Sequence, residues 1–305
     1  MIVKNFKKFL IIPVVILVAA IVVGIIFGGM NLGLDFTGGS QITVDLGETF
    51  DSEKVRAVVE GLDSVTGDVS VITSGADGHE ALIRVQDDSD NAIDDEVVAE
   101  IAEAVAADYP NARPEEVKVD SVGATASGTL IMNALLAVVI ACVLMLIYIT
   151  IRFQLFSAIG AVAALVHDVL IMIMVMCIFQ VSVDSTFIAA CLTIVGYSIN
   201  ATVIIFDRIR DNSKKYPVNV MSTEELVDIS VKESMGRTIN TTITTLIMIL
   251  MLYILGVESI RIFAFPIIIG IFAGTFSSMI VAPSVWALLS KKFGVKTRGG
   301  VKAIR

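Results

Sequence analysis

A histidine and an aspartate stand side by side within a long apolar segment, as His167 and Asp168. Ionisable side chains are costly inside a membrane, and those found there usually belong to ion paths, proton relays or substrate sites. Because helix packing does not need a charge, Asp168 is a candidate for a coupling role rather than a purely structural one. Adjacent residues of a helix point about 100° apart, so the two side chains are not expected to converge on one site without help.

Two other apolar segments carry polar residues at helical spacing. Asn200 lies in the first of them, and Arg237 opens the second. The residues that follow Arg237 at i+3, i+4, i+7 and i+8 share its helix face, and they are Asn240, Thr241, Thr244 and Thr245. A polar face within a membrane is expected to meet another helix or a hydrated crevice, and Ser, Thr and Asn often bridge membrane helices.

The depth of these residues decides which of them can meet. With about 1.5 Å of rise per residue, Asn200 lies roughly 10 Å from the cytoplasmic end of its segment, and Asp168 lies roughly 20 Å from the end of its own. The long side chain of Arg237 can extend toward the level of Asn200. It reaches Asp168 only through water, or if its own helix begins earlier than the hydropathy indicates.

The composition indicates which elements must hold these residues. The chain of 305 residues is 55% hydrophobic and 17% charged, whereas an ordinary soluble domain is about 25% charged. This contrast predicts an α-helical polytopic membrane protein. Six segments have the roughly 20 mostly apolar residues that a membrane helix needs. They are Phe9–Met30, Thr129–Ile151, Leu155–Val183, Thr186–Phe206, Thr238–Val257 and Ile262–Leu289.

Basic residues concentrate in four of the segments outside the spans. The N-terminus, the turn at Arg152, the connection 207–237 and the tail 291–305 hold 16 of the 22 basic residues. These four segments fall on one side if the chain crosses the membrane six times, and cytoplasmic loops are enriched in Lys and Arg. We therefore expect cytoplasmic termini, with residues 1–30 as N-terminus and first span and residues 129–290 as the other five spans.

The large segment outside the spans, residues 31–128, has 22 acidic and only 5 basic residues and is expected on the extracytoplasmic side. Its apolar residues alternate in some stretches and have helical spacing in others, which predicts the order β-α-β-β-α-β. That order is typical of a small ferredoxin-like α+β domain. The expected elements are Ser40–Leu46, Asp51–Leu62, Asp68–Thr73, Glu80–Val85, Asp90–Ala107 and Glu116–Val122.

Several kinds of chemistry find no support in the sequence. The net charge of -9 argues against nucleic acid as a partner. There is no Ser-His-Asp set, no H-E-x-x-H motif and no phosphate-binding loop, so we expect neither an enzyme nor a cofactor nor a metal site. The three cysteines, Cys142, Cys177 and Cys191, lie in apolar runs without metal-ligand spacing and are interpreted as packing residues.

Four motifs give the chain a resemblance to a known family. They are Gly33-Leu34-Asp35-Phe36-Thr37-Gly38-Gly39, Val166-His167-Asp168-Val169, Gly196-Tyr197-Ser198-Ile199-Asn200-Ala201-Thr202 running to Phe206-Asp207-Arg208-Ile209-Arg210, and Ser234-Met235-Gly236-Arg237-Thr238-Ile239-Asn240-Thr241. On these motifs, and over nearly its whole length, the chain resembles SecF, a family of subunits of the bacterial protein-export machinery. SecD proteins share elements of the first two motifs, but they normally carry a much larger outer region.

The resemblance implies half of a twelve-span unit of the resistance-nodulation-division (RND) type, which SecD would complete. Such a pair would associate with the SecYEG channel in the bacterial cytoplasmic membrane. It would use a proton or sodium gradient to help draw the exported polypeptide outward, with membrane carboxylates coupling ion flow to movement of the outer domains. The candidates for ion coupling in this chain are Asp168, Arg237, Asn200 and His167.

One residue departs from the family pattern. The usual motif Gly-Tyr-Ser-Ile-Asn-Asp-Thr has Ala201 in place of its aspartate, whereas the arginine expected to partner that aspartate is kept as Arg237. Alanine cannot carry a proton, so three explanations stay open. Coupling passes to Asp168 or to carboxylates of SecD; the coupling ion or the stoichiometry differs; or the chain is a structural partner without an ion site of its own.

The glycine-rich motif and the overall function each keep an alternative. The stretch Gly33–Gly39 predicts either a plain exit from the membrane, with Asp35 capping the turn, or a hinge at Gly38 and Gly39 on which the outer domain swings. For the whole chain, the rivals to a translocase subunit are a homo-oligomeric RND-type exporter and a passive assembly partner.

Overall fold

The computed structural model describes residues 3, 5–65, 67–74, 78–86, 93–216 and 221–293. The chain divides into two compact units, one of residues 1–31 and 136–305 and the other of residues 32–135. Each is described by itself. Parts of four predicted segments lie outside the described residues: residues 1, 2 and 4 of the N-terminus, the start of the second outer helix at 90–92, residues 217–220 of the connection 207–237, and the basic tail from 294 onward.

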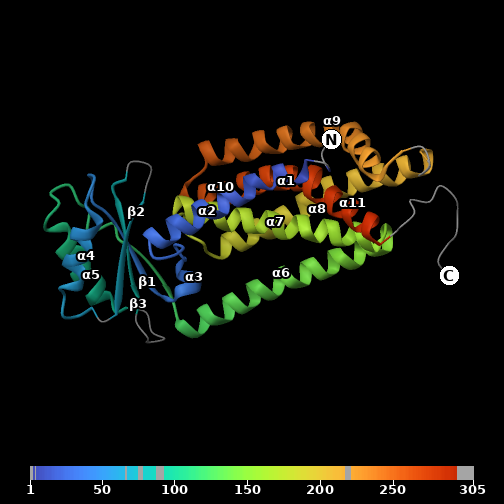
Figure 1. Ribbon diagram of the computed structural model, residues 1–305. Helices are drawn as coiled ribbons and strands as arrows, with labels where there is room; N and C mark the ends of the chain where they lie inside the picture. The colour runs from blue at the N-terminus through green and yellow to red at the C-terminus, as the bar shows by residue number, and fades with distance from the viewer. Residues whose placement is uncertain are drawn as a thin grey trace. The chain divides into compact units, whose positions relative to one another are not determined.

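The first unit is built from long apolar helices (Figure 1). They are α1 (Phe6–Phe9), α2 (Ile11–Ile26), α6 (Ala124–Arg152, with residues 136–152 in this unit), α7 (Leu155–Phe179), α8 (Ser185–Lys215), α9 (Thr223–Leu255), α10 (Glu258–Phe276), the π-helical turn η1 (Ser277–Val281) and α11 (Ala282–Lys292). Within the described residues, six stretches are long and apolar enough to cross a membrane, with α1 and α2 forming one and α10, η1 and α11 forming another. The predicted six-span architecture is confirmed.

Two of the spans extend well beyond their apolar cores. Helix α8 continues to Lys215 and α9 begins at Thr223, so most of the connection expected at 207–237 is helical. The start of α9 is fixed by a capping box, in which Ser222 and Glu225 exchange hydrogen bonds. Hydropathy marks where a helix can enter lipid, but helical hydrogen bonding and capping decide where it ends.

Small residues set the closest helix contacts in this unit. A Cβ atom at Gly160 of α7 would lie 2.7 Å from the carbonyl oxygen of Ala282, so α7 and α11 approach to backbone contact. A Cβ atom at Gly270 of α10 would lie 2.4 Å from Cγ1 of Ile194 on α8. Close approach through small residues is how membrane helices gain packing energy, since burial from water contributes little between them.

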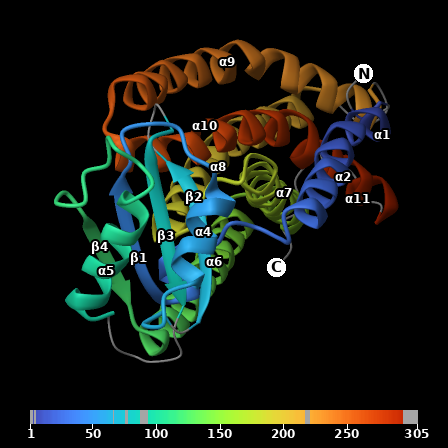
Figure 2. The same cartoon turned by 90° about the vertical axis from the view of Figure 1, so that its left-hand side faces the viewer.

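The second unit is a four-stranded sheet with two helices on one face (Figures 1 and 2). Its elements are α3 (Leu34–Thr37), β1 (Gly39–Asp45), α4 (Ser52–Glu60), β2 (Asp68–Ser74), β3 (Glu80–Gln86), α5 (Asp95–Ala106) and β4 (Lys118–Val122). The strand order is β2-β3-β1-β4, and every neighbouring pair is antiparallel. The predicted ferredoxin-like order is therefore present, because the third strand lies between the first and the second.

Alternation of apolar residues explains which sheet face the helices cover. Ile42 and Val44 of β1, with Ile83 of β3, point to the helix side and are fully buried. Val59 of α4 and Ile101 of α5 are buried against the same cluster. Successive side chains of a strand point to opposite faces, so a strand with one covered face shows this pattern in sequence.

The glycine-rich motif forms a compact turn within this second unit. Leu34–Thr37 make the single helical turn α3, which contacts β1 and β4. Gly38 and Gly39 follow with φ of 70° and 98°. Residues with a Cβ rarely adopt such angles, so these two glycines are what allows the chain to pass from α3 directly into β1. A hinge role for them stays a prediction.

Arg84 supports the entry of this turn. It lies on β3 opposite Gln41 of β1, and it is 8% exposed. Its Nε donates to Oε1 of Gln41 at 2.8 Å, and its Nη1 donates to the carbonyl oxygen of Leu32 at 2.7 Å. The side chain thereby connects the start of the glycine-rich segment to the sheet.

Replacing Arg84 with Ala is expected to destabilise this unit by about 2 kcal/mol, because it removes two hydrogen bonds from a buried charged donor to Gln41 and to the Leu32 carbonyl. Hydrogen exchange of the β3 amides in the full-length chain would measure the change. Arg113→Ala is the matched control, since Arg113 is mostly exposed and its ion pair with Glu116 spans 3.6 Å. Exposed pairs of this kind contribute at most about 1 kcal/mol. Equal exchange in the two variants would contradict the role given to Arg84.

Candidate ion-coupling site in the membrane helices

A ridge of small residues on α7 brings Asp168 into the interior. Gly160, Ala164 and Asp168 recur every four residues and so share one face of the helix. All three are buried, and Asp168 is only 1% exposed. Gly160 contacts Ala282, and the ridge ends where α8 and the turn η1 meet α7. These contacts make the ridge a packing surface of α7.

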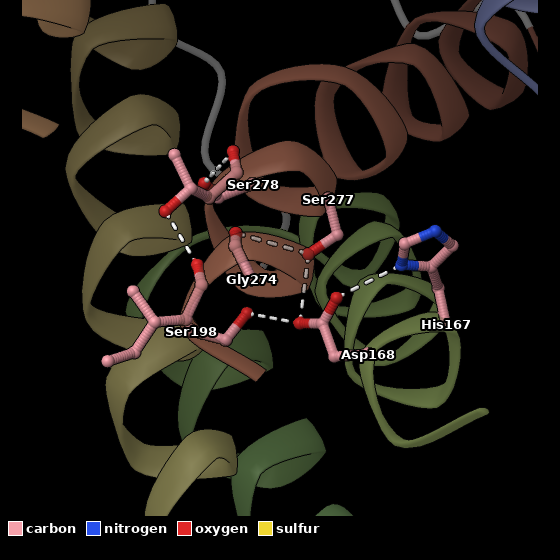
Figure 3. Close-up of polar contacts among 8 residues, drawn as sticks. His167, Asp168, Ser198, Gly274, Ser277 and Ser278 are labelled. Atoms are coloured by element: carbon pink, nitrogen blue, oxygen red, sulfur yellow. Dashed lines mark hydrogen bonds and ion pairs between the residues drawn. The ribbon is translucent and has the colours of Figure 1, made fainter. Parts of the chain in front are cut away.

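Asp168 receives hydrogen bonds from two other spans (Figure 3). Ser198 of α8 donates from Oγ to Oδ2 of Asp168 at 2.6 Å. Ser277, the first residue of η1, donates from Oγ to the same oxygen at 2.9 Å. Three helical elements that are far apart in the sequence therefore meet at one carboxylate.

His167 completes the surroundings of the carboxylate. Its Nδ1 lies 3.0 Å from Oδ1 of Asp168, and its ring stacks on Phe276 with centroids 5.6 Å apart. The two neighbouring side chains, which were expected to converge only with help, meet here with Phe276 packed against the imidazole. The ring of Phe276 thus supports the imidazole in the position where its Nδ1 meets the carboxylate.

Glycine leaves the space that this cluster occupies. A Cβ atom at Gly274 of α10 would lie 3.1 Å from Cβ of Ser198 and 3.6 Å from Oδ2 of Asp168. Figure 3 shows Gly274, Ser198 and Ser277 gathered around the carboxylate. A larger residue at Gly274 would press on the donor and the acceptor together.

The arrangement offsets the cost of a buried charge and also permits a change of charge. An unpaired carboxylate in such a place would be strongly unfavourable, and each hydrogen bond to it contributes about 1.5–3 kcal/mol. Serine hydroxyls both donate and accept. They can therefore donate to a charged Asp168, or accept from it once it carries a proton. Both states leave the polar groups paired, as a proton-coupling residue requires.

The other predicted site residues lie elsewhere. Asn200 and Arg237 are exposed on α8 and α9, and Ala201 is half-buried. Neither Asn200 nor Arg237 forms a side-chain hydrogen bond or ion pair with another described residue. In the part of the chain that the structure describes, the partners of Asp168 are His167 and the two serines rather than Arg237. Although α9 begins earlier than the hydropathy indicates, Arg237 makes no direct contact with Asp168.

The polar face of α9 points away from the chain's own helices. Asn240 and Thr244 are exposed like Arg237, whereas Thr242 is buried and carries the internal contacts. Thr242 accepts a hydrogen bond from Tyr197 of α8 at 3.0 Å and pairs with Thr275 of α10 at 2.9 Å. A face of this polarity is disfavoured against lipid, so it is suited to another polypeptide or to water.

Sequence reasoning did not identify Ser198 and Ser277 as site residues. Ser198 lies within a motif that was singled out, but as one small residue among several. Ser277 has no sequence signal beyond being a polar residue ahead of Pro283 in an apolar span. Their role follows from helix contacts between residues 30 and 109 positions away from Asp168.

The comparisons with known proteins agree with this architecture. The family described as "Protein export membrane protein SecD/SecF, C-terminal" matches residues 101–292, and the "SecD/SecF GG Motif" matches residues 23–49. The chain belongs to the SecD/SecF family. The glycine-rich turn and the membrane helices that hold Asp168 both fall inside these matches.

The individual relatives are SecF and SecDF proteins. The protein translocase subunit SecF of Cereibacter sphaeroides is 40% identical over 294 residues, which cover 94% of this chain and 87% of that protein. Subunit SecDF of Bacillus subtilis is 34% identical over 283 residues, covering 92% of this chain and 37% of that protein. The crystal structure of SecDF from Thermus thermophilus matches with a TM-score of 0.77 and 28% identity, covering 95% of this chain and 38% of that one.

Proposed function

We propose that this chain works with a SecD partner in a Sec translocase and couples an ion gradient to protein export through Asp168. Its likeness to SecF proteins and to SecDF supports an accessory subunit of the translocase in protein export. The observation that carries the coupling role is the buried carboxylate, which three membrane elements supply with hydrogen bonds.

The need for a partner follows from the exposed polar face of α9. Arg237, Asn240 and Thr244 would be poorly placed against lipid, and none of them has a side-chain partner on another described helix. The SecDF relatives indicate SecD as that partner. We place SecD against this face, so that its helices complete a path in which Arg237 and Asn200 take part.

Ala201 directs the coupling to a different carboxylate. It cannot bind a proton, whereas Asp168 can, and its serine partners can serve both of its charge states. Among the three explanations for the missing aspartate, we favour transfer of the coupling role to Asp168, shared with carboxylates of SecD. A change of coupling ion and a purely structural role are the alternatives that experiment must separate.

The surroundings of the complex follow from the same proposal. The excess of basic residues in four segments favours both termini on the cytoplasmic side of a bacterial membrane. The acidic second unit then lies on the outer side, where SecYEG releases the exported polypeptide. No enzymatic step is required of the chain, because its part is to change conformation when an ion binds and leaves.

Isolation of the tagged chain from its native membrane in mild detergent tests the partnership. We expect a SecD-like protein and SecY to be recovered with it, as identified by mass spectrometry. Recovery of further copies of the chain alone would overturn the translocase proposal and favour a homo-oligomeric exporter. Arg237→Ala should lower recovery of the SecD-like protein roughly three- to eighteenfold, as expected for an interhelical hydrogen bond of about 0.6–1.7 kcal/mol.

The control for this variant is Arg210→Ala, another exposed arginine near the end of α8. It removes the same charge and should leave recovery unchanged. The thermal midpoint of the isolated chain should not move in either variant, because both side chains are exposed. Equal loss of the partner in the two variants would contradict a specific contact at Arg237.

A further inference from the structure

The last membrane span contains a widened turn beside Asp168. Helix α10 ends at Phe276, η1 covers Ser277–Val281, and α11 continues from Ala282 without leaving the right-handed helical region. The backbone N–H of Ala282 donates to the carbonyl oxygen of Ser277, five residues earlier. Such turns are rare and are frequent at functional sites.

Pro283, just after the widened turn, explains why the helix departs from α-helical geometry there. Pro283 lies in the first turn of α11. It has no backbone N–H, and in a regular α-helix its ring would collide with the carbonyl of Met279. A π-helical turn is one of the few ways in which a helix accommodates such a residue without a break. The span therefore departs from the α-helical hydrogen-bond pattern at this point.

The first residue of the turn has two acceptors within reach. Oγ of Ser277 lies 2.9 Å from Oδ2 of Asp168 and 3.3 Å from the carbonyl oxygen of Gly274. That carbonyl already lies at the junction of α10 and η1, where the backbone N–H of Ser277 is shared between Ala273 and Gly274. A hydrogen bond from the Ser277 hydroxyl to the Gly274 carbonyl therefore competes with a backbone hydrogen bond of the junction.

We propose that η1 responds to the charge of Asp168 through Ser277, whose hydroxyl donates to the carboxylate when Asp168 is charged and to the Gly274 carbonyl when Asp168 is protonated. In the second state a proton from the aqueous path is bonded to Oδ2. Oδ2–H then donates to Oγ of Ser277, and Ser277 turns its own proton to Gly274. The added proton stays on Oδ2, the hydrogen bond between Ser277 and Asp168 changes direction, and the hydroxyl of Ser277 now donates to the Gly274 carbonyl instead.

This change gives the protonation of one residue a mechanical result. A second donor on the Gly274 carbonyl competes with the backbone N–H of Ser277, so the hydrogen-bond pattern of η1 changes and α11 shifts relative to α10. A switch needs a local change of charge and an element with two arrangements. Asp168 supplies the first, and the π-helical turn supplies the second. The inference rests on the proposed role of Asp168 in coupling.

Few other ionisable side chains lie near Asp168, so its own protonation is the charge change that η1 would sense. His167 is the titratable group that faces it, on the opposite oxygen, and α8 presents the uncharged Ser198. Helix α2 carries no ionisable residue. The charged residues of α10 and α11 lie at their far ends, where Arg261 bonds the Ile254 carbonyl and Lys291 pairs with Glu224.

Hydrogen exchange of the complete chain in lipid nanodiscs tests the proposal. Amides 277–282 are followed across the titration of Asp168, and the infrared band of its carboxyl group, identified by its loss in Asp168→Asn, records the protonation itself. With intrinsic exchange corrected for pH, we expect exchange of these amides to change at least about threefold as the carboxyl group protonates. In Asp168→Asn, the corrected exchange rate of amides 277–282 should be the same at every pH.

Two serine variants separate the switch from ordinary packing. Ser277→Ala should abolish the pH response of amides 277–282 while the carboxyl band still titrates. Ser198→Ala is the matched control, because it removes the other hydroxyl from the same oxygen but lies on α8, and it should keep the response. If Ser277→Ala does not fold, Ser277→Cys replaces it, and its weak S–H donor should reduce the response by more than half.

The outcomes distinguish this inference from the proposed function. A normal exchange response in Ser277→Ala, or a titrating carboxyl band with no exchange response in the unaltered chain, would overturn the switch and leave Asp168 as a coupling residue. A carboxyl band that does not titrate would remove the coupling role and the switch together. Recovery of the SecD-like partner depends on neither result.

Discussion

Replacing Asp168 with Asn is expected to abolish the gradient-dependent part of protein export, a loss of at least about tenfold in that component. The amide has the size of the carboxyl group and can still accept a hydrogen bond from Ser198, so the chain should fold. It cannot take up and release a proton. The measurement is export of a precursor into membrane vesicles that contain the complete translocase, with and without an imposed gradient.

A second carboxylate provides the control for this variant. Asp207 of α8 is half-exposed, and its oxygen lies 3.8 Å from Arg152. Asp207→Asn makes the same chemical change outside the buried cluster and should leave the response to the gradient within about a factor of two, as expected for an exposed ion pair. An undiminished gradient response in Asp168→Asn would leave coupling to SecD or make this chain a structural partner.

The main architecture is predictable because it depends on local patterns. A membrane helix needs a continuous apolar run, and a half-covered strand alternates, so both can be recognised in a short window of sequence. The strand order of the second unit followed from the same windows, since the sequence β-α-β-β-α-β has a common antiparallel solution. Helix ends were less predictable, as α8 and α9 show, because polar helices continue outside lipid.

The site was predictable only in its central residue. Asp168 stands out because a charge in an apolar run is costly. Its partners Ser198 and Ser277 do not stand out, because a serine in a membrane helix is ordinary and because no local pattern connects residues so far apart. The π-helical turn is also hidden, since an average period of 3.6 residues contains no sign of one added residue.

Arg237 shows that the sequence can identify a polar helix face without identifying what that face contacts. Its helix face was correctly identified as polar, but a single helix does not say whether that face meets the same chain or another one. The contacts of Thr242 answer this, because they occupy the inner face of α9 and leave Arg237 outward. A residue can therefore be assigned to a functional face from spacing alone, while its partner cannot.

Replacing Gly270 with Leu is expected to prevent stable folding of the membrane unit. Even one added carbon would lie 2.4 Å from Cγ1 of Ile194 and 2.9 Å from Sδ of Met172. Overpacking by a single group costs about 1–3 kcal/mol, and Leu adds three further carbons in a place enclosed by α7 and α8. Thermal unfolding in detergent should show a large fall in the midpoint, or no folded protein at all.

Gly128→Leu on α6 is the matched control, because a Cβ atom there meets nothing within 4 Å among the described residues. Leucine has a higher helix propensity than glycine by roughly 0.8 kcal/mol, so the control should be neutral or slightly stabilising. Propensity and packing thus predict opposite signs for the same substitution at Gly270. A stable Gly270→Leu variant would mean that α10 does not approach α8 as described. The placement of Gly274 and Ser277 beside Asp168 depends on that approach and would then be wrong as well.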